Sequence, residues 1–131
     1  RLDAPLAIID KRREEANVSE VMHIIGDVEG RHCLIVDDLI DTAGTLVKAA
    51  DALARQGALR VSACATHAVL SGPAMERIEN SRIDKVVVTN SIPLSERAAA
   101  SGRIQVRSVA HLLAQAIQSI HEDGSVSTLF V

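Results

Sequence analysis

The residues whose types and spacing could bind a ligand lie together in one short stretch. Three carboxylates and two threonines surround a turn of small residues, in the order Val36-Asp37-Asp38-Leu39-Ile40-Asp41-Thr42-Ala43-Gly44-Thr45. Small residues let backbone N–H groups approach a ligand closely, and a helix start adds unpaired N–H donors that favour a phosphate. Carboxylates only accept hydrogen bonds, so they suit sugar hydroxyls or a hydrated divalent cation. The stretch therefore predicts a phosphosugar site.

Other interpretations of this stretch explain less of it. No Gly-Lys-Ser/Thr follows the turn, as a nucleoside-triphosphate P-loop requires, and Gly-x-Gly-x-x-Gly of a dinucleotide site is absent. The structural alternative is a helix whose N-cap is Asp41 or Thr42, with acidic residues solvating the end of a strand. That alternative accounts for Asp41 alone, but not for three carboxylates together with Thr-Ala-Gly-Thr.

The elements that must position the turn alternate between strand and helix. Short runs rich in Val, Ile and Leu predict buried strands at 6–9, 33–36, 61–65, 86–88 and 104–106. Helical spacing of apolar residues predicts helices at 46–54 and 109–120, and a proline at its first turn predicts a short helix at 73–80. This alternation predicts an α/β fold with a mostly parallel sheet covered by helices on both faces.

Ligands of such a sheet bind beyond the carboxyl ends of its strands. The residues expected at those ends are Asp10, Asp37, Thr66 and Thr89.

Composition narrows the function classes. The 131 residues are 47% hydrophobic, which suits one domain with its own core. A net charge of -3, with one Phe and no Trp or Tyr, argues against nucleic-acid binding. The apolar runs are too short to span a bilayer, and no secretory signal is present. We expect no membrane association, a cytoplasmic location, and free buried thiols at Cys33 and Cys64.

Four segments in order resemble one known family. The acidic turn resembles the phosphoribosyl-pyrophosphate loop of the type I phosphoribosyltransferase fold. The other three resemble ribose-phosphate pyrophosphokinases, and they are Ile9-Asp10-Lys11-Arg12-Arg13, Thr66-His67-Ala68-Val69-Leu70-Ser71-Gly72-Pro73-Ala74 and Gly124-Ser125-Val126-Ser127-Thr128-Leu129-Phe130. The sequence is identified as a member of that family from about Leu6 to Phe130.

The resemblance implies a type I phosphoribosyltransferase-like fold and a reaction. ATP and D-ribose 5-phosphate would give 5-phospho-α-D-ribose 1-diphosphate and AMP, with Mg²⁺ as cofactor and no dedicated protein metal ligand in this chain. Asp37 and Asp38 would orient the ribose hydroxyls. The 5-phosphate would be held by Asp41, Thr42, Ala43, Gly44 and Thr45.

The basic segment after the first expected strand would carry the catalytic groups. The resemblance implies that Lys11 is the catalytic lysine, and that Arg13 is catalytic and also contacts the ribose-5-phosphate. Cations on a mobile loop can close over the charge of a transferred phosphoryl group and exclude water. The alternative is a solvated charge cluster that pairs with Glu14 and Glu15. We assign no catalytic role to His67, which has no nucleophile partner that can be placed.

The tail implies regulation. By resemblance, Ser125, Ser127 and Phe130 would form an allosteric phosphate or ADP site at a subunit interface, together with Asn17. The family implies homo-oligomers, with hexamers built from dimers. The alternative for this segment is a frayed C-terminus.

We expect residues 1–131 to be a C-terminal phosphoribosyltransferase-like domain, truncated on its N-terminal side, because the chain opens on Arg1-Leu2-Asp3-Ala4-Pro5. Such a fragment would lack much of the ATP site and be inactive alone. Two alternatives stay open. A base-transferring type I phosphoribosyltransferase would share the acidic turn, but it explains neither the basic segment nor the tail. A non-catalytic, synthetase-associated regulatory subunit should have degraded motifs, whereas the motifs are intact here.

Overall fold

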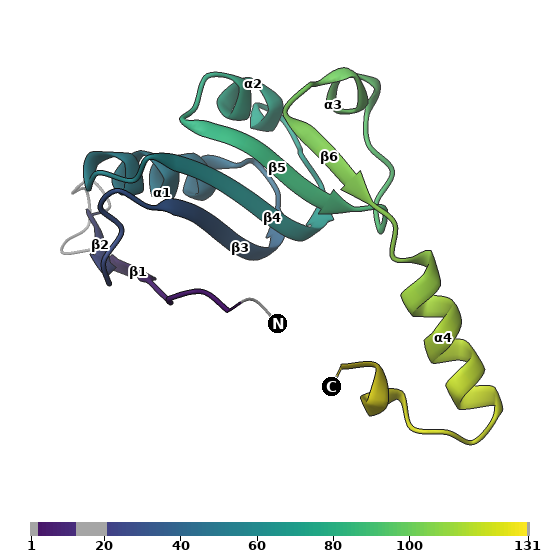
Figure 1. Cartoon of the computed structure of the whole chain (residues 1–131). Coiled ribbons are helices and arrows are strands. Elements are labelled where there is room, and N and C mark those ends of the chain that lie inside the picture. Colours follow the sequence, from purple (N-terminus) through teal and green to yellow (C-terminus); the bar gives the residue numbers. More distant parts are fainter. Residues whose placement is uncertain (1–2, 13–20, 131) are drawn as a thin grey trace.

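A computed structural model describes residues 3–12 and 21–130. They form a main sheet with helices beside it, a separate two-stranded sheet, and a C-terminal helical segment that lies apart (Figure 1). The elements are β1 Ile8–Arg12, β2 Val21–Ile25, β3 His32–Ile40, α1 Gly44–Arg55, β4 Arg60–Ala68, α2 Ala74–Glu79, β5 Ile83–Thr89, α3 Glu96–Ala100, β6 Ile104–Arg107, α4 Ala110–His121 and the 3-10 helix η1 Val126–Phe130.

Strands β3 to β6 form a four-stranded parallel sheet in the order β3-β4-β5-β6. The register joins Val36 to Cys64, Cys64 to Val87, and Val88 to Val106. Sequential order with helical crossovers is the expected result for strands that each lead into a helix. The predicted α/β class, with a parallel sheet flanked by helices, is confirmed.

The core lies between one face of this sheet and helices α1 and α2. Alternate residues of the two central strands are buried there, and they are Val61, Ala63, Ala65, Ile83, Val86 and Val88. They pack in one cluster with Leu46, Ala50 and Leu53 of α1 and with Ile78 of α2. The small side chains of Ala63 and Ala65 in β4 lie in this cluster, beneath the helices.

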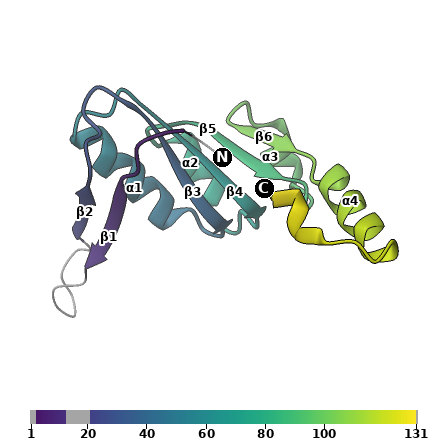
Figure 2. The same cartoon turned by 60° about the horizontal axis from the view of Figure 1, so that its bottom comes forward.

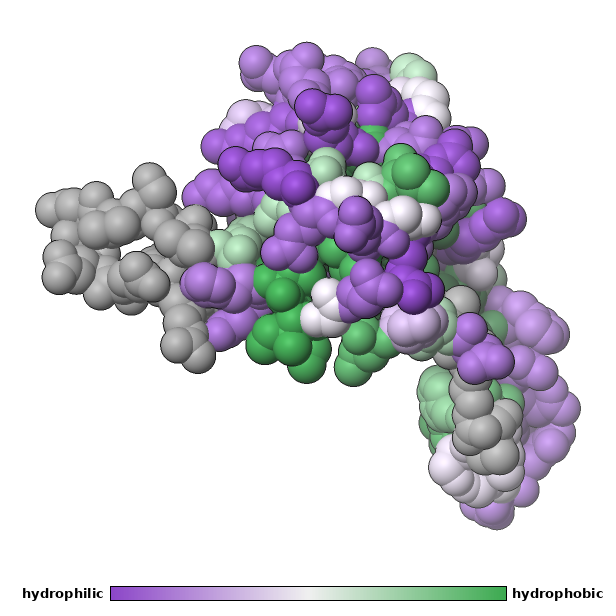
Figure 3. Space-filling view, turned by 60° about the vertical axis from the view of Figure 1, so that its left-hand side comes forward, coloured by the Kyte–Doolittle hydropathy of each residue, from purple (hydrophilic) through white to green (hydrophobic). Residues whose placement is uncertain are grey.

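The opposite face of the sheet is open in the part of the chain that the structure describes. Leu34 and Val36 on β3 are 46% and 69% exposed. With the lower side turned forward, the strands lie in front of α1 and α2 (Figure 2). Figure 3 shows apolar side chains gathered along this lower side, whereas the helix side is mainly hydrophilic. The expectation of a sheet covered by helices on both faces is therefore not met in the described residues, and burial on both faces is wrong for β3, the edge strand.

The first predicted strand does not join the parallel sheet. Instead β1 pairs with β2 in a separate antiparallel sheet, with Ile9 opposite Ile24. Ile9 and Ile24 pack against the core, but Ile8 is 53% exposed and Leu6 82%. The strand is thus half-buried, and its neighbour β2 contacts α1. An apolar run too short to show a period cannot distinguish these two placements.

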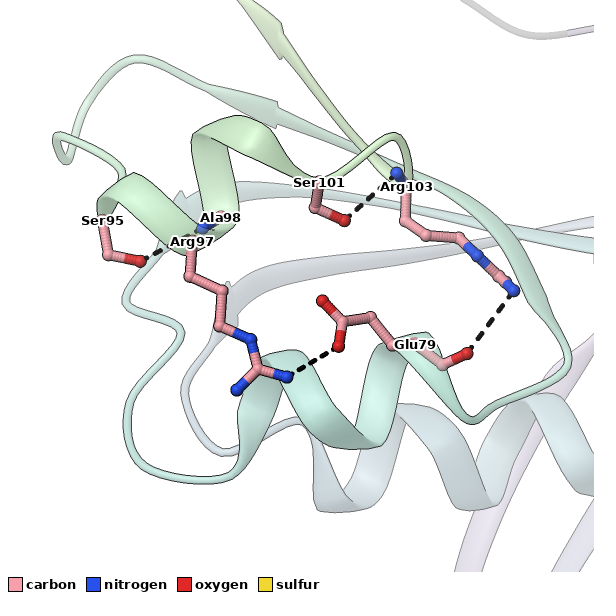
Figure 4. Close-up of polar contacts among 6 residues, drawn as sticks. All are labelled: Glu79, Ser95, Arg97, Ala98, Ser101 and Arg103. Carbon is pink, nitrogen blue, oxygen red and sulfur yellow. Dashed lines mark hydrogen bonds and ion pairs between the residues drawn. The ribbon is translucent and has the colours of Figure 1, made fainter.

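Polar contacts fix α3, which the sequence analysis did not predict, against α2 (Figure 4). Arg97 donates to the Glu79 carboxylate at 2.7 Å, and Ser95 caps α3 by accepting from Ala98 N–H at 3.3 Å. The Arg103 guanidinium donates to the carbonyl oxygen of Ile83 at the start of β5. Arg97 thus joins α3 to α2, and Arg103, just before β6, joins its segment to β5 and to the Glu79 carbonyl oxygen of α2.

The final helix is confirmed, but it projects away from the sheet (Figure 1). No residue of α4 is buried, and its apolar side chains Leu113, Ile117 and Ile120 are 56%, 68% and 66% exposed. Within residues 3–12 and 21–130, no helix combines the length and the apolar character needed to cross a bilayer.

Candidate functional site

The acidic turn lies where β3 leads into α1. A pocket of about 180 Å³ forms there. Its lining residues are Asp37, Leu39, Ile40, Asp41, Thr42, Ala43, Gly44, Thr45 and Leu46. The structure thus brings together Asp37 and the whole run of predicted phosphate-binding residues from Asp41 to Thr45.

The start of α1 has no side-chain cap in the described structure. Its N-cap is Ala43, with a left-handed backbone at φ 58° and ψ 8°, and the first turn contains no acidic residue. The helix begins at once, because Val47 N–H donates to the Ala43 carbonyl oxygen at 3.0 Å. The alternative in which Asp41 or Thr42 caps this helix is therefore wrong. The N–H groups of Gly44, Thr45 and Leu46 precede the first helical bond, so they are available to an anion.

Asp37 and Asp38 lie inside β3 rather than after it. The strand continues to Ile40 because β4 is equally long, and Asp37 pairs with Ala65. Neighbouring strand residues project to opposite faces, so the two carboxylates point to different sides of the sheet. The Asp38 N–H donates to the Asp37 carboxylate at 3.0 Å. Only Asp37 lines the pocket beside the turn.

A network of hydroxyl groups joins the carboxyl ends of β4 and β5. Thr89 Oγ1 and Ser91 Oγ both donate to the Thr66 carbonyl oxygen, at 2.7 Å and 2.9 Å. His67 Nδ1 lies 3.0 Å from Ser91 Oγ, which gives this histidine a partner in the network. Thr66 and Thr89 also line a second pocket of about 240 Å³ on the open face. The predicted gathering of Asp37, Thr66 and Thr89 at one edge is observed, whereas Asp10 lies in the separate β1–β2 sheet.

Two side chains that the sequence analysis missed reach the acidic turn. Ser71 donates its hydroxyl to the Asp41 carboxylate, and Arg77 Nη1 donates to the Thr42 carbonyl oxygen at 2.9 Å. Both follow β4, 30 and 35 residues further along the chain. Ser71 lies in the segment Thr66–Ala74 that resembles the family, and Arg77 lies in the predicted helix 73–80, but neither signal indicates a contact with the acidic turn.

The chain matches a described family over nearly its whole length. Residues 8–131 match the "Phosphoribosyl synthetase-associated domain". This chain belongs to that family.

Curated members and a solved structure agree with this assignment. The chain is 62% identical over 130 residues to the "Ribose-phosphate pyrophosphokinase" of Caldanaerobacter subterraneus subsp. tengcongensis, covering 99% of this chain and 41% of that protein. It is 61% identical to the protein of the same name from Chromobacterium violaceum, over 98% of this chain and 39% of that protein. The phosphoribosylpyrophosphate synthetase of Mycobacterium smegmatis superposes with a TM-score of 0.80 at 39% identity, over 92% and 38% of the two chains. This chain spans about two fifths of the length of these relatives.

The catalytic residues expected for the family are described only in part. The backbone of Lys11 lies in β1, opposite Met22, rather than in a loop beyond the parallel sheet. Arg13 lies outside the described residues, as does Asn17. The roles given to Lys11 and Arg13 stay predictions.

The tail residues expected to bind an anion are partly brought together. Ser125 and Ser127 place their hydroxyl oxygens 2.6 Å apart, and Thr128 Oγ1 donates to the Ser125 carbonyl oxygen at 2.8 Å. Phe130 at the end of η1 is 70% exposed. This order favours a formed segment over a frayed end, while its regulatory role stays a prediction.

Both cysteines are free thiols and half-buried. Burial raises the pKa of each thiol, and at Cys33 the positive charge of Arg31 opposes this rise. A raised pKa leaves less thiolate near neutral pH, so neither cysteine has the character of a nucleophile. Cys64 borders the second pocket as an apolar wall.

The left-handed backbone of Ala43 is testable. A β-branched residue at φ 58° clashes with its own carbonyl, so Ala43→Val should lower the free energy of unfolding by about 2 kcal/mol. Glycine adopts this backbone readily, so Ala43→Gly should stay within about 1 kcal/mol of the unmodified chain. Urea denaturation of the three proteins measures both values. Equal midpoints for the two variants would show that the turn does not depend on this conformation.

Proposed function

We propose that this chain supplies the ribose-5-phosphate-binding part of a ribose-phosphate pyrophosphokinase. The observation that carries the proposal is the pocket at the uncapped start of α1, with Asp37 on its wall. The curated relatives carry the name of this enzyme at about 60% identity. These two relatives are not named as base-transferring phosphoribosyltransferases or as regulatory subunits, so their names support neither alternative.

The pocket offers the right donors and acceptors for a phosphorylated sugar. Backbone N–H groups at Gly44, Thr45 and Leu46, with the Thr42 and Thr45 hydroxyls, would donate to the 5-phosphate. The positive end of the α1 dipole favours the same dianion. Of the two expected acids, Asp37 borders the pocket and would accept from ribose hydroxyls, whereas Asp38 points to the other side of the sheet. Both acids are exposed, so their oxygens are accessible to hydroxyl donors.

The transfer itself needs no protein nucleophile. The anomeric oxygen of ribose 5-phosphate would attack the β-phosphorus of ATP, the bond from that phosphorus to the α–β bridging oxygen would break, and AMP would leave. The hydroxyl proton would pass to water as the new O–P bond forms. Positioning two bound substrates supplies most of the rate in such reactions. Lys11 and Arg13 would stabilise the charge on the transferred diphosphoryl group.

Mg²⁺ fits this proposal as an ion carried by substrate phosphates. In the described residues no group of three or more His, Cys, Asp or Glu is placed to hold a metal. Mg²⁺ in proteins commonly binds one or two carboxylates and completes its shell with water and phosphate oxygens. Asp37 or Asp38 would supply such a single ligand, and the ion would neutralise phosphate charge.

We also propose that the protein is cytoplasmic and forms homo-oligomers, with hexamers built from dimers. The anion site of the tail would lie at a subunit interface. The free thiols of Cys33 and Cys64 suit a reducing compartment. The exposed apolar residues of α4 suit burial against other protein.

We further propose that the chain alone does not catalyse the transfer. It spans about two fifths of its relatives, and neither described pocket offers a lysine beside the acidic turn. A mixture of the chain with ATP, Mg²⁺ and ribose 5-phosphate should release no AMP, as followed by chromatography. AMP that accumulates with time and with protein concentration would contradict this.

Binding of ribose 5-phosphate tests the site directly. Thr45→Val keeps the shape of the side chain but removes its hydroxyl donor, so calorimetry with Mg²⁺ should show binding weakened about tenfold. Thr128→Val, in the distant η1, is the matched control and should bind as the unmodified chain does. Equal weakening by both variants, or unchanged binding by Thr45→Val, would remove the 5-phosphate from this loop.

A further inference from the structure

The turn from Asp41 to Thr45 is held from outside by one neighbouring segment. Leu70 N–H donates to the Ile40 carbonyl oxygen at 3.0 Å, and Ser71 N–H donates to the Asp41 carbonyl oxygen at 3.1 Å. These bonds continue the β3–β4 pairing beyond both strand ends. Leu70 and Gly72, at φ 50° and 51°, curve the chain around Ser71. Ser71 therefore reaches the turn from a fixed backbone.

The side chain of Ser71 forms a hydrogen bond with the Asp41 carboxylate. Its hydroxyl donates to Oδ1 of Asp41, in addition to the backbone bond between the same two residues. A carboxylate directed at a bound phosphate would repel it. With one oxygen bound to Ser71, Asp41 is oriented by its neighbour and shapes the turn, rather than competing with the ligand for the N–H groups of α1.

Arg77 of α2 approaches the same turn from the helix side. Its Nη1 donates to the Thr42 carbonyl oxygen at 2.9 Å. A Cβ built on Gly44 would lie 3.2 Å from that nitrogen, so the missing side chain of Gly44 leaves room for the guanidinium. Gly44 has no left-handed backbone, so a side chain there would disturb this close approach rather than strain the backbone.

The charge of Arg77 is available to the turn. Within residues 3–12 and 21–130, Arg77 makes no ion pair, in contrast to Arg31 with Asp27, Arg60 with Asp84 and Arg97 with Glu79. Its bond to the neutral Thr42 carbonyl does not neutralise the guanidinium charge. Arg77 thus holds the backbone next to Ala43 and adds positive potential beside the start of α1.

We propose that Ser71 and Arg77 are positioning residues that keep the Asp41–Thr45 turn in its anion-binding form. Arg77 acts through the Thr42 carbonyl and Ser71 through the Asp41 carboxylate. The identity of the anion as ribose 5-phosphate rests on the proposed function, whereas the fixing of the turn does not.

Hydrogen exchange on the ligand-free chain tests the fixing alone. Arg77→Met keeps the aliphatic stem but removes the donor and the charge. The amides of Ser71 and Val47 should then exchange about tenfold faster, because their acceptors lie in the turn. The amide of Leu59, bonded to the Arg31 carbonyl oxygen at 2.8 Å near the other end of the sheet, should be unchanged. Arg82→Met, an exposed arginine just before β5, is the charge-matched control.

Calorimetry at low ionic strength tests the consequence for binding. Ribose 5-phosphate should bind Arg77→Met about tenfold more weakly and Arg77→Lys within about threefold of the unmodified chain, because lysine keeps the charge and one donor. Ser71→Ala should weaken binding about threefold, because the freed Asp41 carboxylate then opposes the phosphate.

The outcomes separate the two proposals. Local acceleration of exchange in Arg77→Met, with no ribose 5-phosphate binding by the unmodified chain, would support the fixing and refute the proposed function. Exchange equal to that of Arg82→Met, or acceleration that extends to Leu59, would overturn the positioning role.

Discussion

Ala43 turns the chain from β3 into α1 with a left-handed backbone, and this one conformation determines what the turn can do. A serine, threonine or aspartate cap would satisfy the first N–H groups of the helix internally. Here the helix starts without such a cap, so its donors face the pocket that Asp37 borders. A non-glycine residue in this region costs about 1–2 kcal/mol, and it persists only where the surroundings determine it. Here Ser71 and Arg77, which follow β4, hold the two residues before Ala43 through hydrogen bonds to Asp41 and Thr42.

The sheet makes this arrangement possible because β3 and β4 are equally long. Their pairing runs from His32 to Ile40 and is continued by the bond from Leu70 to Ile40. The loop after β4 therefore arrives beside the loop after β3. Two segments about 30 residues apart in sequence meet at the carboxyl edge, which is where parallel sheets bind ligands. The family membership of the chain and the chemistry of this edge agree.

Sequence reasoning predicted those features that depend on local pattern. The strands of the sheet, helices α1, α2 and α4, and the acidic turn all follow from residue types and spacing. Burial of β3 on both faces was wrong, because an apolar run looks alike in a central strand and in an edge strand with one open face. The pairing of β1 with β2 was missed. Apolar and polar residues alternate only weakly in β2, and the partner of a short strand is set by tertiary packing.

The remaining gaps concern contacts over long sequence distances. Asp41 and Thr42 are favourable cap residues, yet Ala43 is the N-cap because the β3–β4 pairing and Arg77 fix the backbone before the helix. Neither the Arg77–Thr42 bond nor the space that Gly44 leaves for it can be deduced from spacing.

The central claim is that the first N–H groups of α1 bind a phosphate. Amide chemical shifts during titration with ribose 5-phosphate, and separately with ribose, test it most directly. We predict that the Gly44, Thr45 and Leu46 amide signals move with ribose 5-phosphate and stay in place with ribose. Equal responses to the two sugars, or shifts that spare these amides, would contradict it.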